Sequence, residues 1–353
     1  MTREFPRRPA PTIYDVARVA GVATSTVSRA FARPGRVNAD TAARIRAVAE
    51  DLGYRANPIA RALSTSRTRM LAVMISDITN PFYAELVRWT QLAAQEAGYV
   101  ILLVDAQESD TLERETLERL LPVVDGIVIG SSRMSDSALR TIAKQKPMVV
   151  LNRELTGVPS VVTDSLRGMR RAVEHLGGLA HDTITYVAGP DASWADGMRW
   201  RALREAGHEL DLVTRRIGPF APTFAGGLKA AGELAAYPTT AVIAYNDPMA
   251  IGVIRGLERA GLRVPEDVSV IGFDDTLMSR LVRPALTTVA APLREMGATG
   301  VRDLLAVLNG AQAETGHAFV LPVRLVVRGS TAQCSRKSTS PALGTTNVSG
   351  SAS

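Results

Sequence analysis

The 353-residue sequence has a single cysteine, Cys334, and no long hydrophobic run, and each absence excludes a class of protein. One cysteine in a polar segment can form neither a disulfide framework nor a thiolate metal cluster. No apolar run approaches the roughly 20 residues that cross a bilayer, and residues 1–11, MTREFPRRPAP, lack the apolar core of a signal peptide. The sequence therefore predicts a cytoplasmic protein without membrane spans.

The sequence also lacks the short motifs that mark many enzymes. It contains no GxGxxG, no Walker loop, no GxSxG and no HExxH. A nicotinamide dehydrogenase is disfavoured because ISDITNPFY, instead of a glycine-rich loop, follows the first apolar strand. His175 and His181 share the stretch HLGGLAH but have no carboxylate or cysteine at metal-ligand spacing. We therefore expect no enzyme activity, no cofactor and no metal site.

Lysine is missing from the first 69 residues, yet this end of the chain is strongly basic. It contains 13 Arg against 5 Asp and Glu, a net charge of +8, whereas the whole chain carries only +6. A merely solvated surface would mix charges of both signs, so charge concentrated at one end is the electrostatic footprint of phosphate binding. The composition thus indicates a nucleic-acid-binding head.

Within this end, residues 12–37, TIYDVARVAGVATSTVSRAFARPGRV, have the pattern of two short helices joined by a tight turn. Thr12 followed by Asp15 resembles a capping box at the start of the first helix, which Gly21 ends. A second helix is expected at about 24–32 with an apolar buried face. Small hydroxyls and Arg29 remain on its outer face, where a helix-turn-helix contacts phosphates and base edges.

We therefore predict DNA contacts from this head, and the alternative is an ordinary helical hairpin with a solvated polar face. Asn38 can cap a third helix that runs to about Leu52 and closes a three-helix domain. The head residues predicted to contact DNA are Thr12, Thr24, Ser25, Thr26, Ser28, Arg29 and Asn38.

From Met70 onward, short apolar runs alternate with amphipathic helical segments. The runs are MLAVMIS, YVILLVD, GIVIG, PMVVL, TITYVAG, TTAVIAY and VSVIGF. Continuous apolar strands that alternate with helices predict parallel sheets covered by helices on both faces, but this periodicity does not give the number of sheets. Residues 1–11 and 331–353, poor in large apolar side chains, are expected to be a disordered arm and a disordered tail.

Two segments of the head, YDVARVAGVATSTVSRAF and VNADTAARIRAVAEDLGYRANPIARALS, resemble the DNA-binding domain of the lactose-repressor family of bacterial transcription regulators. The similarity continues through NPFYAEL, NDPMAIG, VPEDVSVIGFDD and PALTT, and so covers about residues 10–330. One departure is Ala23, where the family usually has a serine that caps the recognition helix. Thr24 is expected to replace it, with the helix starting one residue later.

The resemblance implies a homodimer, or a tetramer, that binds a palindromic double-stranded operator. Residues 57–64, NPIARALS, start like a helix, but an isolated helix of about two turns is marginal in water. By resemblance this is a hinge helix that pairs with its counterpart in the minor groove. Asn57, Ala60 and Leu63 would contact DNA there, with Leu63 inserted between two central base pairs. The alternative is that Leu63 is a linker residue packed on the core.

The same resemblance implies a division into domains. A helix-turn-helix domain (12–56) and a hinge helix with its linker (57–69) would precede a core (70–330) of two doubly wound parallel-sheet lobes, as in a periplasmic sugar-binding protein. The chain would cross between the lobes near 151, 291 and 322. The N-lobe would then contain about 70–151 and 292–322, the C-lobe about 152–291 and 323–330, and the ligand would bind between them.

Polar side chains follow several of the predicted strands, at the ends where open α/β sheets bind ligands. Carboxylates, amides and guanidinium groups around aromatic rings suit a polyhydroxylated ligand. By resemblance, Arg199, Asn246 and Asp274 match the main effector contacts of the family, and Phe220 matches an aromatic residue that covers the ligand. Each of these positions has a structural alternative, namely a helix cap, an ion pair or packing. The residues predicted to bind the effector are Asp77, Phe82, Tyr83, Asn152, Arg153, Arg199, Phe220, Asn246 and Asp274.

These observations predict a sequence-specific DNA-binding repressor that is released from its operator by a small polar ligand, a sugar or a sugar derivative. The ligand must act by favouring one arrangement of the lobes. A nucleobase or nucleoside ligand, or a corepressor, stays an alternative, because Ala291 stands where many relatives carry a glutamine that reaches the effector. A solute-binding protein or a carbohydrate enzyme is a remoter alternative that leaves the basic head unexplained.

Overall fold

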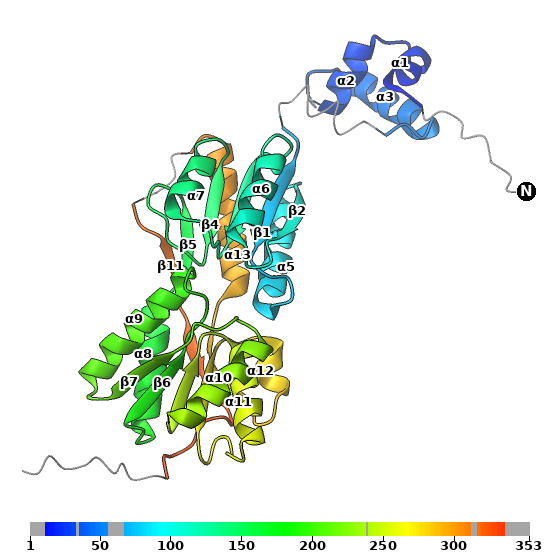
Figure 1. Cartoon of the computed structure of the whole chain (residues 1–353). Coiled ribbons are helices and arrows are strands. Elements are labelled where there is room, and N and C mark those ends of the chain that lie inside the picture. Colours follow the sequence, from blue (N-terminus) through cyan, green and yellow to red (C-terminus); the bar gives the residue numbers. More distant parts are fainter. Residues whose placement is uncertain (1–10, 33–34, 56–66, 238, 312–315, 336–353) are drawn as a thin grey trace, which may run out of the picture.

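The computed structural model describes residues 11–32, 35–55, 67–237, 239–311 and 316–335 (Figure 1). It has a helical head and a core of two α/β lobes, which confirms the predicted fold class. Asn57, Ala60 and Leu63 lie outside the described residues, and so does the expected hinge helix. Within the described ranges, no helix is long and apolar enough to cross a membrane.

Three helices form the head around a small apolar core. They are α1 (Ile13–Ala20), α2 (Thr24–Ala32) and α3 (Ala39–Asp51). At the start of α1, the backbone amide and the hydroxyl of Thr12 donate to the carboxylate of Asp15, at 2.9 and 2.8 Å. The Asn38 side chain accepts from the amide of Asp40 and so caps α3. Val16, Val27 and Ile45, one from each helix, are fully buried against one another.

The expectation that Thr24 replaces the missing serine cap is wrong. Helix α2 begins at Thr24 itself, and the carbonyl of Ala23 already accepts the amides of Thr26 and Val27, at 2.9 and 3.2 Å. The capping position is therefore still Ala23, which has no side-chain acceptor.

The N-lobe is a six-stranded, wholly parallel sheet with strand order β11-β5-β4-β3-β1-β2. Its central strands are continuously apolar because helices cover both faces: α5 and α13 pack on one face, α6 and α7 on the other. The strands are β1 (Met70–Ile75), β2 (Val100–Asp105), β3 (Gly126–Gly130), β4 (Met148–Leu151), β5 (Ser160–Thr163) and β11 (Phe319–Leu321). The helices are α5 (Pro81–Glu96), α6 (Asp110–Leu120), α7 (Asp136–Ala143) and α13 (Leu293–Leu308).

The C-lobe repeats this architecture with the order β12-β10-β9-β8-β6-β7, in which only β12 is antiparallel to its neighbour. Helices α8 and α9 lie together, and α10 and α11 form the other pair (Figure 1). The strands are β6 (Thr183–Val187), β7 (Val213–Ile217), β8 (Ala241–Ala244), β9 (Ser269–Asp274), β10 (Thr287–Ala290) and β12 (Arg324–Val326). The helices are α8 (Ser165–Gly178), α9 (Trp194–Glu209), α10 (Phe224–Ala236), α11 (Asp247–Arg259) and the short α12 (Leu277–Leu281).

The expected crossing near residue 151 is wrong. Strand β5 still belongs to the N-lobe, where it pairs with β4 and β11, so the chain leaves this lobe only after Thr163. Strand β5 is hard to recognise in the sequence, because it has four residues and begins and ends with buried Ser160 and Thr163 instead of large apolar side chains. The later crossings lie between β10 and α13 and between β11 and β12.

The expectation that the tail is disordered from residue 331 onward is wrong for its first five residues. The amide of Cys334 donates to the carbonyl of Leu179 at 2.8 Å, and the amide of Ala332 donates to the hydroxyl of Ser269 at 3.1 Å. Residues 331–335 are thus hydrogen-bonded to the C-lobe.

Helices α10 and α11 are in contact through two glycines, and this predicts a steric defect. A Cβ on Gly252 would lie 2.2 Å from the carbonyl oxygen of Phe224 and 2.9 Å from the Cα of Gly227, and backbone atoms cannot move aside cheaply. Gly252→Ala should lower the free energy of unfolding by about 1–3 kcal/mol in urea titrations. Gly232→Ala is the control: it is also on α10 but faces open space, so it should raise stability by about 1 kcal/mol. Unchanged stability of Gly252→Ala would contradict the close packing.

Candidate functional site

The winding of each sheet reverses beside its first strand. Strand β1 lies between β2 and β3, and β6 lies between β7 and β8. In each lobe, the second strand therefore lies on one side of the first strand, and the third strand lies on its other side. At such points the loops after neighbouring strands separate and leave a crevice, where open α/β sheets bind ligands. The loops concerned are 76–80 and 131–134 in the N-lobe, and 188–193 and 245–247 in the C-lobe.

Two cavities open between the lobes. The first, of about 620 Å³, is lined by Glu108, Asp110 and Arg133 of the N-lobe and by residues 190–192 and 219–223 of the C-lobe. The second, of about 590 Å³, is lined by Asp274, Ala291 and residues of the last two crossings. Because the first cavity draws on strand ends from both sheets, the carboxyl ends of the two sheets face each other across it.

The backbone is unusual at these strand ends. Residues other than glycine rarely adopt positive φ, and where they do, the strain is often part of a functional site. The residues concerned here follow β2, β3 and β4 or end and follow β9: Gln107, Glu108, Ser131, Asn152, Asp274 and Asp275, with φ between 50° and 116°. Six of the nine non-glycine residues with positive φ in the described ranges thus lie at these carboxyl ends, and Arg69, Ala180 and Asp211 lie elsewhere.

On the C-lobe side, the structure brings Arg199 of α9 and Asp274 of β9 together. Both side chains are buried, and Nη2 of Arg199 lies 3.6 Å from Oδ1 of Asp274. The guanidinium donates to the carbonyl of Tyr245 and lies over the rings of Phe273 and Tyr245, 3.5 and 4.9 Å from their centroids. Its Nε has no hydrogen-bond partner among the described residues. Arg199 and Asp274 therefore form an ion pair without a direct hydrogen bond. Both side chains can still form further hydrogen bonds.

Asp247 organises the loop that follows β9. It is fully buried, and it accepts the amide of Thr276 at 2.7 Å and the hydroxyl of Thr288 at 2.6 Å. Burial raises the pKa of Asp247 to about 7. Burial also raises the pKa of Asp274 well above its ordinary value, with Arg199 opposing the rise and Asp247 adding to it. Asp274 thus lies close to both the guanidinium of Arg199 and a second buried carboxyl, that of Asp247.

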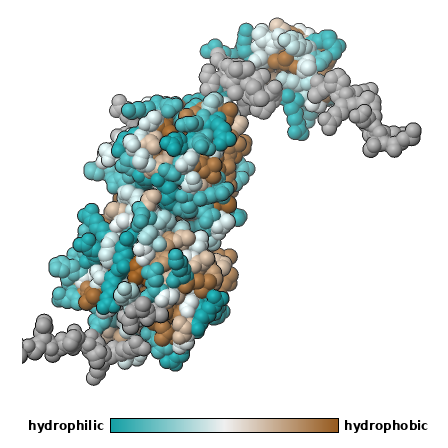
Figure 2. Space-filling model, in the orientation of Figure 1, coloured by the Kyte–Doolittle hydropathy of each residue, from teal (hydrophilic) through white to brown (hydrophobic). Residues whose placement is uncertain are grey.

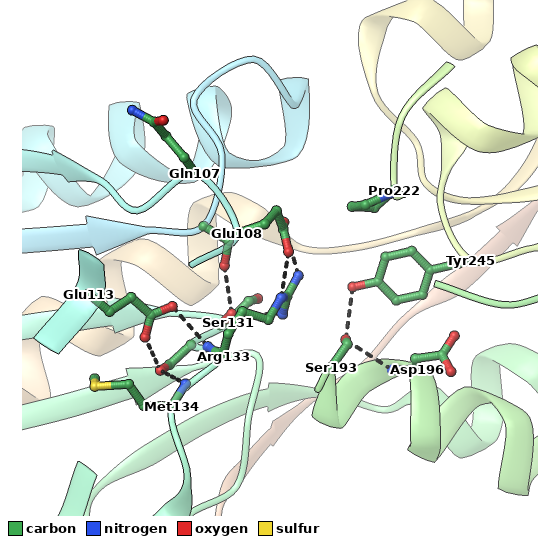
Figure 3. A network of polar contacts seen from close by, with 12 residues as sticks. Gln107, Glu108, Glu113, Ser131, Arg133, Met134, Ser193, Asp196, Pro222 and Tyr245 are labelled. Atoms are coloured by element: carbon green, nitrogen blue, oxygen red, sulfur yellow. Dashed lines mark hydrogen bonds and ion pairs between the residues drawn. The ribbon is translucent and has the colours of Figure 1, made fainter. Parts of the chain in front are cut away.

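On the N-lobe side, the structure shows a cation that sequence reasoning missed (Figure 3). Arg133 follows β3, is 8% exposed, and pairs through Nε and Nη2 with the two carboxylate oxygens of Glu108, the Nη2 contact at 3.0 Å. Although burial lowers the pKa of Arg133, interactions with Tyr83, Tyr245 and Glu108 raise it overall. Arg133 therefore stays charged and lies near tyrosines of both lobes.

Asn152 and Arg153 hold the loop that carries Arg133. Asn152 donates to the hydroxyl of Ser131 at 2.9 Å, and Nη1 of Arg153 donates to the carbonyls of Ser132 and Met134, at 3.1 and 2.7 Å. These bonds give both side chains a structural role, and their contact with an effector stays a prediction.

The other predicted effector residues also have protein partners. Asp77 accepts the amide and hydroxyl of Thr79, at 2.8 and 2.7 Å. Asn246 caps α11 and donates to the carbonyl of Pro222 at 2.9 Å. Phe82 and Tyr83 are buried at the start of α5, with ring centroids 5.0 Å apart. Phe220 lines the 620 Å³ cavity.

Three residues of the cleft were missed although a signal was present. Arg133 and Tyr245 each follow a buried apolar strand by three residues or fewer, and Glu108 follows the apolar but partly exposed edge strand β2 by three residues. The rule that selected Asn152 and Asn246, a polar group just after a strand, would have selected these residues too.

In the head, the residues predicted to contact DNA differ in exposure. Thr12, Ser25, Arg29 and Asn38 are exposed, whereas Thr24, Thr26 and Ser28 are half-buried on α2. Thr12 and Asn38 also use their side chains in the helix starts described above. Arg29 is thus the exposed cation on the outer face of the second helix.

Together these features define a class: a helix-turn-helix regulator with a ligand-binding core. Residues 12–57 match the family described as bacterial regulatory proteins, lacI family, and residues 173–331 match a periplasmic binding protein-like domain. The chain is 34% identical over 330 residues to the transcriptional regulator DegA of Bacillus subtilis (strain 168), covering 91% of this chain and 98% of DegA. It is 33% identical over 333 residues to the transcriptional repressor CytR of Escherichia coli (strain K12), covering 91% and 96%.

Solved structures agree with these matches. The Lac repressor dimer bound to operator and the anti-inducer ONPF has a TM-score of 0.80 and 28% identity, over 91% of this chain and 99% of that chain. A LacI family regulator from Enterococcus faecalis V583 with bound ribose has a TM-score of 0.68 and 31% identity, over 75% and 99%. The chain belongs to the lacI family of bacterial regulatory proteins. It is a DNA-binding transcriptional repressor and not an enzyme.

The buried Asp247 predicts a pH dependence of stability. Its carboxyl has a pKa of about 3.9 when unfolded and about 7 when folded, so at intermediate pH the folded state binds more protons. The free energy of unfolding should therefore fall as the pH rises from about 4 to about 7. Asp247→Asn cannot ionise and should flatten this part of the profile in urea titrations, whereas Asp191→Asn, on an exposed loop, should not. Equal slopes in wild type and Asp247→Asn would refute the shift.

Proposed function

We propose that this repressor acts in the cytoplasm as a homodimer on a palindromic operator, and that a small uncharged polar ligand, a sugar or sugar derivative, releases it. The observation that carries the proposal is the 620 Å³ cavity shared by the two lobes and edged by strained strand ends. A ligand enclosed by both lobes stabilises one lobe arrangement, and only such differential binding can change the affinity for DNA.

The charges of the cleft favour a neutral ligand. Arg133 is paired with Glu108 on the N-lobe wall, and Arg199 lies 3.6 Å from Asp274 on the C-lobe wall. An anionic ligand would have to compete with these carboxylates and would leave buried charge unmatched. Hydroxyl groups, in contrast, can donate to the carboxylates and accept from the guanidinium groups without separating either pair. The ribose in the Enterococcus structure is a ligand of this kind.

Exposed apolar side chains support the dimer. Leu277, Met278 and Leu281 of α12 are 67, 49 and 64% exposed, and Val100 and Leu103 of β2 are 65 and 44% exposed. Figure 2 shows apolar patches over both lobes on the side where Figure 1 places β2 and α12. Exposed apolar patches of this kind mark protein interfaces, and a second copy that covers both lobes would keep the two heads together on one operator.

The recognition face is tested at Arg29. Arg29→Ala should leave the fold intact and weaken binding to a DNA site selected by the wild type, by about 1–3 kcal/mol, because it removes a base or phosphate contact. Arg44→Ala removes the same charge from the exposed side of α3 and should have a smaller effect. Gel-shift titrations at a fixed moderate salt concentration measure both. Wild-type affinity of Arg29→Ala would rule out the proposed recognition face.

The effector site is tested at the ion pair of the C-lobe. Arg199→Ala and Asp274→Ala should bind the operator normally but lose the response to the effector, because each removes a hydrogen-bonding group from the ligand and leaves the other buried against it without its match, at a cost of about 1–3 kcal/mol or more. Arg263→Ala breaks an exposed ion pair of the same lobe and should respond like the wild type. If the ion pair is only structural, both cleft variants will lose stability and DNA affinity together. A normal response by both would place the effector elsewhere.

A further inference from the structure

We infer that Arg67 is a positioning residue for DNA binding, because it anchors the chain that arrives from the head to the last turn of α13. The anchor fixes the point of the core from which the head extends. This role concerns DNA binding alone, so it goes beyond the proposed function and does not depend on the identity of the effector.

The guanidinium of Arg67 lies at the C-terminal end of α13. Its Nη2 donates to the carbonyl of Leu308 at 2.8 Å, and its Nη1 donates to the side-chain oxygen of Asn309 at 3.1 Å. The last carbonyls of a helix have no partner within the helix, and a cation is stabilising beside them. The last turn of α13 has no basic side chain of its own. Arg67 supplies the charge instead, from a position 241 residues earlier in the sequence than Leu308.

The next two residues continue the attachment. The amide and the hydroxyl of Thr68 donate to Oδ1 of Asp125, at 2.7 and 2.8 Å, and the amide of Arg69 donates to Oδ2 at 2.9 Å. Asp125 directly precedes β3, and its own amide donates to the carbonyl of Met70, the first residue of β1, at 2.8 Å. Each of the three residues before β1 is thus bonded to the N-lobe, and Arg67 is the one on the side of the head.

Helix α13 is a firm support for this anchor. It has 16 residues and packs closely on α5, since a Cβ on Gly297 would lie 2.8 Å from the amide nitrogen of Thr90. Leu293 and Glu295, at its start, line the 590 Å³ cavity. Its other end lies on the side of the N-lobe where the chain arrives from the head (Figure 1). One helix therefore borders the cleft with its first turn and holds the incoming chain with its last.

The alternative role for an arginine close to the basic head is a direct contact with a DNA phosphate. Both terminal nitrogens of Arg67 are already bonded within the core, and the residue is half-buried. A phosphate contact would have to replace these bonds. The two roles also differ in their response to salt, because a phosphate contact releases counterions and makes binding more salt-dependent, whereas an anchor within the core does not.

Gel-shift titrations of the full chain on a DNA site selected by the wild type test the anchor, at a temperature where all variants are folded. Arg67→Ala should weaken binding about fivefold or more, because the chain at residue 67 can then move relative to the core and DNA binding must fix it at a cost in conformational entropy. Arg67→Lys should restore part of the affinity, since an ammonium group can still donate to the carbonyl of Leu308. Arg302→Ala, which removes the same charge from the exposed side of α13, is the control and should bind like the wild type.

A double-mutant cycle separates the anchor from a phosphate contact. Asn309→Ala removes one acceptor without a change of charge and should weaken binding less than Arg67→Ala does. The double variant should bind no more weakly than Arg67→Ala alone, because the two residues act through one contact, and the salt dependence should stay that of the wild type. A shallower salt dependence in Arg67→Ala, with no effect of Asn309→Ala, would show a phosphate contact and overturn the inference. Wild-type affinity of Arg67→Ala, with or without a lower melting temperature, would overturn it as well.

Discussion

The parallel direction of the strands is the constraint on which the rest of this structure depends. All six strands of the N-lobe and five neighbouring strands of the C-lobe run the same way within their sheet, so the loops that follow them emerge at one edge. When two such edges face each other, every loop that could bind a ligand borders the same cleft. The residues with positive φ at the ends of β2, β3, β4 and β9 lie at this same edge of their sheets.

The charged groups of the cleft are held by a layer of hydrogen bonds beneath them. Glu113, on α6, accepts the amide of Arg133 at 2.8 Å and the hydroxyl of Ser132, while Arg153 holds the same loop from the other side. Asp247 does the same for the loop that follows β9. Buried polar groups are stabilising only when their partners are in place, so these bonds help to hold the loops of both cleft walls in position.

The sequence could predict the head and most strands because their signals are local. Helical spacing and caps define α1 to α3, and continuous apolar runs mark β1 to β4, β6, β8 and β9. Strand β7, VTRRI, was missed because it is an edge strand with exposed charged side chains, and β5 was missed because it is short. In the cleft, no local pattern shows which partner a polar group will take: Asp77 bonds to Thr79 of its own loop, whereas Asn246 bonds to Pro222 and Arg133 pairs with Glu108, each in another loop. Such pairing depends on tertiary structure.

The order of the crossings has a consequence for synthesis on the ribosome. Helix α13 supplies Leu293, Met296 and Leu304 to the core of the N-lobe, and β11 completes its sheet, yet both are translated after almost the whole C-lobe. Until then, the sheet formed by β1 to β5 carries an uncovered apolar face beside α5. The N-lobe, which is synthesised first, is therefore completed late. Its apolar face stays open to aggregation while the C-lobe folds.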